Sequence, residues 1–508
     1  MPHTVYIIGA GPGDPGLITV RGLQCLQSAD VVLHDHWVHS RLLRHARPGA
    51  EIIDVGMASP QPLEQEAICY LLVEKAREGK TVARLKWGDP FVFDRGGAEA
   101  LFLHEQGVQF EVVPGVPAAI GASAYAGIPL TYPGAGDALV LLRGHEDEAG
   151  RVPDIDWEAL ARVDGTIACY AGGRLIPTLL QKLLDHGVAP DAAAALIVGG
   201  TLPSQRTIAA TVGELLERTS SETPSETALL IVGEVSSLRE HLRWFDERPL
   251  FGRKIVVTRS QEQARELVDA LENLGAQAIE APTFRLTPPE DPEAVDRAAA
   301  SVDEYSWVVF ESANAVARFL SALSRGPRDL RALGRVRICA IGPSTSDRLA
   351  SHGIKADVNV PELGAESIGD AIEARGSIAA QRVLVVRPDH LRGVVGEDLE
   401  RRGAAVTDLV AYRTAAASQD SPAAQAIYRM LLDGQIDAVT FTSPTAVTRF
   451  AQLIGEEQAA DLLNTTVVAP IGPVTAAAAT ELGITSTVMP ETFTVDGLVK
   501  ALVARFRH

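Results

Sequence analysis

Asp35 is the first residue of the sequence whose type and place could support catalysis. It follows an apolar run in the segment VVLHDHWVHS, and a carboxylate at the end of a strand can act as a general base. The alternative is an exposed aspartate that only ends the strand. His34, His36 and His39 flank it and raise the question of a metal, but no further acidic or cysteine ligand completes such a site. We therefore predict no metal here, and expect surface histidines or contacts to carboxylates of a substrate.

A loop rich in glycine and proline, GAGPGDPG at residues 9–16, follows a predicted strand and precedes a helical pattern. Dinucleotide-binding loops in this position carry G-x-G-x-x-G. Here Asp14 takes the third glycine position, and its negative charge disfavours a pyrophosphate, so the pattern argues against NAD. Two interpretations stay open, a tight strand-to-helix turn and a ligand-binding loop.

Two further segments combine glycines with apolar residues, RLKWGDPFVFDRGGAEA at 84–100 and VVPGVPAAIGASAYAGIPLT at 112–131. Glycines let the backbone approach a ligand closely, and Asp89 could accept hydrogen bonds from hydroxyl or amino groups. The span 112–136 carries no charge and is long enough to suggest a membrane crossing. Its prolines and glycines favour a loop-rich site instead.

In the second half of the chain, four hydroxyl residues stand at turns after predicted strands: Ser312, Thr345, Ser443 and Thr475. Hydroxyls and backbone N–H groups at such turns could bind carboxylates, or the hydroxyls could cap the helices that follow. The two roles are compatible, because helix N-termini attract anions. Arg259 and Arg387 are cationic candidates for the same carboxylates, or they merely end their strands.

Short β-branched runs alternate with helical patterns through the first half, which predicts an α/β fold with a largely parallel sheet. The predicted strands are 5–10, 30–35, 81–86, 166–172 and 229–235, and the predicted helices are 18–29 and 63–79. The segment 238–254 then has the pattern of a terminal helix followed by a linker, because Pro249 and Gly252 interrupt it.

The second half contains an internal duplication with a spacing of about 130 residues. WVVFESANAVARFL at 307–320 resembles AVTFTSPTAVTRFA at 438–451, and other segments match at the same spacing. This length suits two α/β lobes with a ligand cleft between them. We therefore predict a first domain at 1–245, a linker at 246–253 and a second domain at 254–508, whose lobes are 254–286 plus 415–508, and 287–414.

The loop at 9–16 and the segments at 84–100 and 112–131 together closely resemble the tetrapyrrole methylase family, and within it uroporphyrinogen-III C-methyltransferase, over residues 4–245. The resemblance implies two α/β lobes with S-adenosylmethionine between them, a homodimer, and transfer of two methyl groups to uroporphyrinogen III, giving precorrin-2. Asp35 stands at the family's proposed proton acceptor, so we favour its catalytic interpretation. The implied cofactor contacts are Pro12, Trp87, Gly88, Asp89, Val92, Pro117, Ala118, Ala171 and Gly200.

The chain departs from this family pattern at several positions. Trp87 replaces the first glycine of Gly-Gly-Asp, and Asp94 replaces the first glycine of F-G-R-G-G. Met57 replaces a lysine proposed to donate a proton, which a thioether cannot do. Pro117 and Ala171 replace a threonine and a methionine. These changes leave an alternative in which the first half is a degenerate methyltransferase, kept for binding, dimerisation or regulation.

The second half resembles uroporphyrinogen-III synthase over 252–508, through the ordered set FESANAV, AIGPST, LVAYRT, FTSPTAV and PIGPVT. The resemblance implies two α/β lobes joined by two crossing strands, and closure of hydroxymethylbilane to uroporphyrinogen III with inversion of ring D and no cofactor. Tyr412 stands where the family has a tyrosine that assists departure of the hydroxyl group, or it is a strand aromatic at the lobe junction. The fusion predicts a bifunctional enzyme of tetrapyrrole biosynthesis, whose product leads toward sirohaem or cobalamin.

The composition limits the partners of the chain. Its 508 residues include 46 Lys and Arg against 65 Asp and Glu, a net charge of −19, which argues against nucleic-acid or anionic-membrane binding in general. The substrates implied above are themselves anionic, so their clefts must be locally favourable to carboxylates. Four widely spaced cysteines and an N-terminus without a signal-peptide pattern predict a cytoplasmic protein with reduced, buried thiols.

Overall fold

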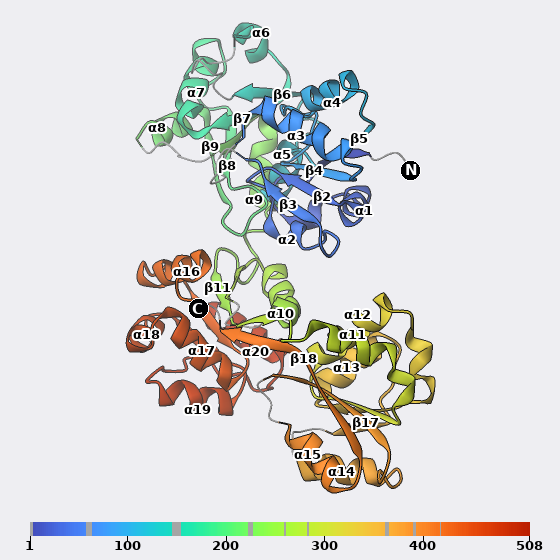
Figure 1. The fold of residues 1–508 in the computed structure, drawn as a ribbon. Helices are drawn as coiled ribbons and strands as arrows, with labels where there is room; N and C mark the ends of the chain where they lie inside the picture. Colours follow the sequence, from blue (N-terminus) through green and yellow to red (C-terminus); the bar gives the residue numbers. More distant parts are fainter. Residues whose placement is uncertain are drawn as a thin grey trace.

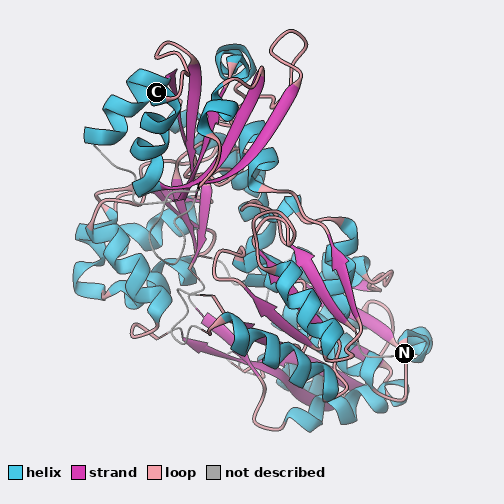
Figure 2. Cartoon of the chain, turned by 90° about the horizontal axis from the view of Figure 1, so that it is seen from above, coloured by secondary structure: helices cyan, strands magenta, loops and turns pink. Residues whose placement is uncertain are grey.

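Figure 1 shows the fold of the chain in a computed structural model, in which four β-sheets are arranged along the molecule. The structure describes residues 4–56, 63–144, 154–221, 227–258, 261–281, 284–360, 365–389, 393–416 and 418–507. Helices lie on the faces of the sheets, as the view in Figure 2 shows. The predicted α/β class is confirmed.

The first sheet is five-stranded and parallel, in the order β3-β2-β4-β1-β5. Its central strands are buried on both faces, which explains why the sequence shows continuous apolar runs there instead of alternation. The strands are β1 (Val5–Gly9), β2 (Val31–His34), β3 (Glu51–Asp54), β4 (Val82–Lys86) and β5 (Phe110–Val113), and the helices are α1 (Val20–Ser28), α2 (Ser40–Leu43), α3 (Gln65–Arg77) and α4 (Gly96–Glu105).

The second sheet has the order β6-β7-β10-β8-β9, and only its β6–β7 pair is parallel. Helix α5 (Ala118–Tyr125) packs on one face through Ala119 and Ala122, while α7 (Ile176–Asp185) and α8 (Val212–Ser221) cover the other. The strands are β6 (Ala138–Gly144), β7 (Gly165–Gly172), β8 (Ala193–Val198), β9 (Arg206–Thr211) and β10 (Thr227–Val232), and α6 (Trp157–Ala161) precedes β7.

The third sheet is parallel, in the order β12-β11-β19-β20, and joins strands from both ends of the second half. Its strands are β11 (Lys254–Val257), β12 (Gln277–Glu280), β19 (Ala438–Phe441) and β20 (Val467–Pro470). Its helices are α10 (Gln261–Asn273), α16 (Pro422–Leu432), α17 (Pro444–Ile454), α18 (Glu456–Leu463), α19 (Pro473–Glu481) and α20 (Val495–Phe506).

The fourth sheet has the order β13-β18-β17-β14-β15-β16 and is parallel except for β13. Its strands are β13 (Phe284–Thr287), β14 (Trp307–Phe310), β15 (Arg337–Ile341), β16 (Val358–Val360), β17 (Arg382–Pro388) and β18 (Ala405–Ala416). Its helices are α11 (Pro292–Ala300), α12 (Ala313–Arg325), α13 (Pro343–Ser351), α14 (Ala365–Glu373) and α15 (Val394–Arg401).

The duplication is visible as the same series of elements in both lobes. β14, α12, β15 and α13 correspond to β19, α17, β20 and α19, and the first helix of each series starts with a serine N-cap of nearly identical backbone geometry. The chain passes between the lobes along the antiparallel pair of β13 and the end of β18, which pairs Phe284 with Ala416. In Figure 1 the long β18 runs between the two lobes.

The segment 238–254 is less helical than the sequence predicted. Helix α9 (Arg239–Leu242) has only four residues, and Arg243 is already extended. The following aromatic residues pack instead against Tyr125 and each other, with ring centroids 4.7 Å apart for Tyr125 and Phe245 and 5.3 Å apart for Phe245 and Phe251. This packing replaces the helix, because a straight helix could not bring these rings onto Tyr125.

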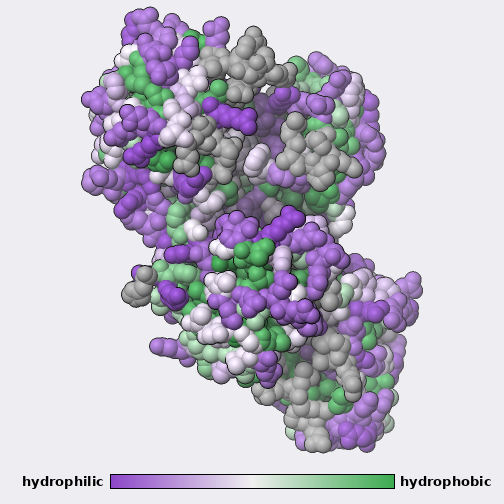
Figure 3. Space-filling view, turned by 90° about the vertical axis from the view of Figure 1, so that its left-hand side faces the viewer, coloured by the Kyte–Doolittle hydropathy of each residue, from purple (hydrophilic) through white to green (hydrophobic). Residues whose placement is uncertain are grey.

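The face drawn in Figure 3 is mainly hydrophilic, with apolar side chains in small groups. No helix among the described residues is long and apolar enough to cross a membrane. The four cysteines are buried and free, as predicted, and burial raises the pKa of each thiol. Between the two halves, Arg41 contacts Glu272 at 2.5 Å and Arg44 contacts Glu280 at 2.6 Å.

Candidate active sites

A cavity of about 1670 Å³ lies between the carboxyl edge of the first sheet and one face of the second. It is larger than the roughly 300–1,000 Å³ of a pocket for one small molecule, so it has room for two ligands side by side. Eight of the nine predicted cofactor contacts line it, as does Asp35: Pro12, Trp87, Gly88, Asp89, Val92, Pro117, Ala118 and Gly200.

Glycines bring the three sequence motifs into direct backbone contact beside this cavity, which Gly88 lines. A Cβ at Gly9 would lie 2.5 Å from Cα of Gly115, and one at Gly115 would lie 2.2 Å from the carbonyl oxygen of Gly88. Gly11 and Gly88 exchange two backbone hydrogen bonds, of 3.2 and 2.9 Å. No side chain fits at Gly9 or Gly115, so these two glycines hold the motifs together, while Gly88 leaves space for a ligand.

Asp89 has a structural role in the same region. Its Oδ1 accepts a hydrogen bond from the N–H of Phe91 at 2.8 Å, and its Oδ2 accepts one from the N–H of Gly115 at 2.9 Å. The carboxylate therefore joins the second motif to the third. A ligand that contacts Asp89 meets oxygens that are already hydrogen-bonded.

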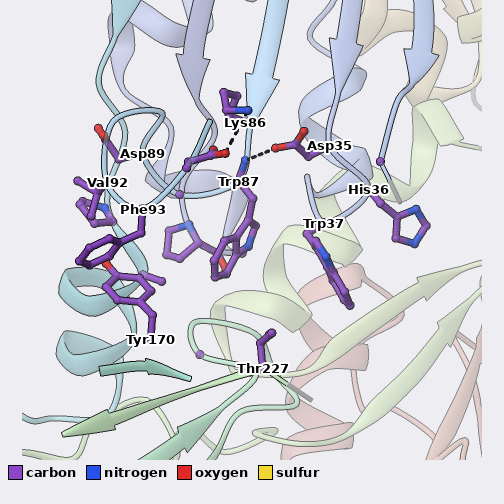
Figure 4. A pocket seen from close by; sticks show the side chains of 18 of the residues that line it. Asp35, His36, Trp37, Lys86, Trp87, Asp89, Val92, Phe93, Tyr170 and Thr227 are labelled. Atoms are coloured by element: carbon purple, nitrogen blue, oxygen red, sulfur yellow. Dashed lines mark hydrogen bonds and ion pairs between the residues drawn. The ribbon is translucent and has the colours of Figure 1, made fainter. Parts of the chain in front are cut away.

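Trp87 forms one wall of the cavity and links the first motif to the second. Its indole Nε1 donates to the carbonyl oxygen of Pro12 at 3.0 Å, and its backbone N–H donates to Oδ2 of Asp35 at 3.1 Å. Figure 4 shows Trp87 and Trp37 pointing into the same space, opposite Phe93 and Tyr170. The cavity therefore has flat aromatic walls, which suit flat ligands.

A buried ionic cluster lies behind this wall. The Arg84 guanidinium contacts Asp35 at 2.5 Å and Glu99 at 3.3 Å, and the Lys86 ammonium contacts Glu99 at 3.1 Å and Asp94 at 3.2 Å. Arg84, Lys86 and Glu99 are almost fully buried, so each charge depends on its partners for stability. One oxygen of Glu99, Oε2, has no hydrogen-bond partner among the described residues.

The surroundings shift the pKa values of the two cavity-lining carboxyls, Asp35 and Asp94, in opposite directions. Burial alone would raise the pKa of Asp35, but the charges of Arg84 and Lys86 and the hydrogen bonds it accepts hold that pKa below its ordinary value. Burial raises the pKa of Asp94, Lys86 opposes this only in part, and the nearby Asp35 adds to it. Asp94 is therefore the more basic of the two carboxylates.

In the second half, Ser312 and Tyr412 meet at the carboxyl edge of the fourth sheet. The two hydroxyl oxygens are 3.0 Å apart, and Ser312 Oγ also accepts the N–H of Ala315 at 3.1 Å as the N-cap of α12. Ser443 caps α17 in the same way, accepting the N–H of Ala446 at 3.2 Å. Both serines are therefore caps, and Ser312 has in addition a contact to the predicted catalytic tyrosine.

Glu311 is the most unusual group near this pair. The residue is 5% exposed, and within the described part of the chain neither of its carboxyl oxygens has a hydrogen-bond partner. Burial raises its pKa to about 7, which Arg387 opposes and Asp408 supports. Arg387 itself donates two hydrogen bonds to the Asp408 carboxylate, of 2.7 and 2.8 Å, so much of its positive charge is neutralised within the protein.

Comparisons with known proteins agree with this geometry. A family model of tetrapyrrole (corrin/porphyrin) methylases matches residues 4–216, and one of uroporphyrinogen-III synthase HemD matches 265–500. A porphyrin biosynthesis protein HemD from Ruminiclostridium josui is 34% identical over 500 residues, which are 98% of this chain and 97% of that protein. The chain belongs to the family of fused tetrapyrrole methylases and uroporphyrinogen-III synthases.

Two further relatives cover the methylase domain alone. The uroporphyrinogen-III C-methyltransferase of Priestia megaterium is 44% identical over 232 residues, 46% of this chain and 97% of that protein. The solved uroporphyrin-III C-methyltransferase of Thermus thermophilus, complexed with S-adenyl homocysteine, is 38% identical and covers 46% of this chain and 99% of its own, with a TM-score of 0.40.

Some predicted residues lie elsewhere than the sequence suggested. Ala171 does not line the methylase cavity, because successive side chains of β7 point to opposite faces and Ala171 packs with α7 while Tyr170 faces the cavity. Thr345 and Thr475 of the synthase domain are 1% and 4% exposed, so both hydroxyls lie within the fold. Arg259 and Met57 lie outside the described residues.

Sequence reasoning gave no functional role to Arg84, Lys86, Glu99 or Glu311. Arg84 and Lys86 lie in the segment 84–100, but their partners are up to 49 positions away in the sequence. The one available signal for Glu311 was the duplication, since FESANAV has a glutamate where FTSPTAV has Thr442.

Replacing Glu311 by glutamine (E311Q) should increase the free energy of unfolding over that of the wild-type protein by more at pH 8 than at pH 5. The folded state binds the Glu311 proton more tightly, with a pKa of about 7 against an ordinary 4.5, so wild-type stability falls as pH rises across this range. The variant lacks this loss and should gain up to about 3 kcal/mol at pH 8. Scanning calorimetry at both pH values measures the difference in midpoint.

The exposed Glu397 of α15 offers a control in the same lobe, because E397Q also removes one carboxylate. Its midpoint should shift equally at both pH values. An E311Q shift that is likewise the same at pH 5 and pH 8 would show that Glu311 does not titrate between them.

Proposed function

We propose that the chain is a bifunctional enzyme of tetrapyrrole biosynthesis. The synthase domain closes hydroxymethylbilane to uroporphyrinogen III with inversion of ring D, and the methylase domain transfers methyl groups from S-adenosylmethionine to that product, giving precorrin-2. The observation that carries the proposal is the large aromatic-walled cavity of the methylase domain, which is joined in one chain to a two-lobed synthase domain with Ser312 and Tyr412 in contact. The product of one domain is then the substrate of the other.

The cavity fits S-adenosylmethionine beside a flat macrocycle. Gly88 has a φ of +72° and a Cβ there would meet nothing closer than the N–H nitrogen of Ala118, at 3.9 Å, so its backbone is open to a ligand. Pro117, Ala118 and Gly200 add an apolar wall suited to adenine. When bound, the sulfonium supplies the methyl group as an electrophile, and these residues contribute by orienting it and by excluding water.

In the synthase domain, the first step is loss of the hydroxyl group of hydroxymethylbilane as water, which requires a proton at that oxygen. We assign this role to Tyr412, which Ser312 holds in place at 3.0 Å. N–H groups at the start of α12 and α17 are the groups suited to the substrate carboxylates. We also assign Ser443 to the binding of substrate carboxylates. Arg387 can bind such a carboxylate only by exchanging Asp408 for it.

We also propose that the protein is a cytoplasmic homodimer, associated through the methylase domain. The alternative, a synthase whose methylase domain only binds or regulates, is favoured by one observation, the Trp87 side chain, which lines the cavity at the position of the first glycine of the family pattern Gly-Gly-Asp.

Product analysis of the purified chain separates these possibilities. With hydroxymethylbilane alone, oxidation of the product should yield type III porphyrin, and with added S-adenosylmethionine it should yield methylated product. Type I porphyrin alone would rule out the synthase assignment. Type III porphyrin that stays unmethylated in the presence of the cofactor would rule out methyl transfer and establish the alternative.

The duplicated serines give a matched test of the synthase site. S312A and S443A each remove one N-cap hydrogen bond and should each cost about 1 kcal/mol of stability. Only S312A also removes the hydroxyl that contacts Tyr412, so it alone should slow ring closure, by up to about tenfold. Y412F should slow it further. If S443A slows ring closure as much as S312A, the Ser312–Tyr412 contact has no catalytic part.

Removing the indole N–H of Trp87 should weaken cofactor binding. W87F keeps an aromatic wall but loses the 3.0 Å hydrogen bond to Pro12, and we expect S-adenosylmethionine affinity to fall by about three- to tenfold in calorimetric titrations. Trp244 makes the same kind of bond, to Ala124 at 2.9 Å, outside the cavity. W244F is therefore the control, and an equal loss of affinity in both variants would contradict the role of Trp87.

A further inference from the structure

Asp94 reaches the cavity through a strained turn. The preceding residue, Phe93, has a φ of +54°, in the left-handed region that a bulky side chain rarely adopts. Its ring packs edge-on against Tyr170, with centroids 5.3 Å apart, which fixes the turn. Strain of this kind persists where the surroundings impose it, often at functional sites. The consequence here is that the Asp94 carboxyl lines the cavity and is not turned to the outside.

The other carboxyl at this place, Asp35, is poorly suited to bind a proton. Its Oδ1 lies 2.5 Å from the buried Arg84 guanidinium, and its Oδ2 accepts the N–H of Trp87 at 3.1 Å. Both oxygens are thus engaged with donors. Protonation would break the contact to Arg84 and leave this buried cation with Glu99 as its one carboxylate partner among the described residues.

Asp94 has the opposite arrangement. Its Oδ1 accepts the N–H of Arg95 at 2.6 Å and lies 3.2 Å from the Lys86 ammonium, while no residue of the described ranges hydrogen-bonds its Oδ2. The side chain is 23% exposed, within the cavity. One oxygen is therefore held in place and the other is available to a ligand.

The charges around Asp94 favour a proton in the cluster. Lys86 faces it from β4 and Asp35 from the end of β2, and the two cations of β4, Arg84 and Lys86, act on Glu99 of α4. The cluster contains three carboxylates and two cations within a mostly buried volume, so it lacks one positive charge. Asp94 contacts the cluster through one carboxyl oxygen and faces the cavity with the other. A ligand in the cavity can therefore supply the missing positive charge to Asp94 as a proton.

We propose that Asp94, and not Asp35, accepts the proton that the substrate releases on methylation. The proposal rests on the methyltransferase activity proposed above. A carbon of a pyrrole ring forms the new bond to the methyl carbon with its own electron pair, and the electron pair of the sulfur–carbon bond stays on sulfur as S-adenosylhomocysteine leaves. The ring then carries one positive charge, which it loses by giving one proton to Oδ2 of Asp94. Asp94 releases this proton to water before the next transfer. Asp35 acts as a positioning residue that holds Arg84 and the backbone of Trp87.

The test compares isosteric variants of the full-length chain in methyl transfer to uroporphyrinogen III from pH 5.5 to pH 9. D94N should lower kcat by about a hundredfold or more and remove the acid limb of the kcat profile, while the Kd for S-adenosylmethionine changes by less than about twofold. D94E keeps a carboxylate and should restore part of kcat together with the limb. D35N should instead weaken the binding of S-adenosylmethionine and retain the acid limb of the kcat profile.

Glu99 provides the matched control, because it also pairs with Lys86 but does not line the cavity. E99Q removes one negative charge from the same cluster, and it should lower the melting temperature while keeping the acid limb. Wild-type kcat and an intact limb in D94N would overturn the proposal, as would loss of the limb in D35N alone. Absence of methylated product with the wild-type chain would instead refute the methyltransferase activity itself.

Discussion

Contact between backbone segments at three glycines determines the geometry of the methylase domain. Gly9, Gly88 and Gly115 end or follow three neighbouring strands of a parallel sheet, and a Cβ at Gly9 or at Gly115 would overlap the backbone of the other two glycines. Parallel strands place their carboxyl ends at one edge, so the loops after them converge there. The cavity, the Trp87 wall and the Asp89 cross-link all follow from this convergence, and larger residues at these crossings would separate the motifs.

The buried ionic cluster depends on the same edge. Arg84 and Lys86 are two positions apart on β4, so their side chains point to the same face of the sheet. On that face, α4 supplies Glu99 and two loops supply Asp35 and Asp94. Ions at this depth are tolerated only when each is paired, so loss of any single member leaves an uncompensated charge. The network therefore combines a structural requirement with a chemical consequence, since it sets the relative basicity of the two carboxyls that face the cavity.

Local patterns of apolar residues predicted the α/β class and the duplicated lobes, and the family resemblance predicted that the three motifs form one site. The sequence could not predict which charges pair. Asp35 looked like a free base because its partner Arg84 is 49 positions away. Ala171 was misplaced by one step of strand alternation, which a motif does not reveal. Thr345 and Thr475 stand at turns as predicted, but the first turns of α13 and α19 bury them.

The net charge of −19 and an anionic substrate are compatible if binding uses locally favourable groups, such as the helix N-termini, or exchanges partners within the protein. Arg387 is held by Asp408, and Arg84 and Lys86 are held by carboxylates of the cluster, so none of the three offers an unopposed charge. A substrate carboxylate that binds Arg387 must displace Asp408, and the displaced charge then lies near Glu311, which favours the protonated form of that residue. We therefore expect substrate binding at Arg387 to be coupled to proton uptake.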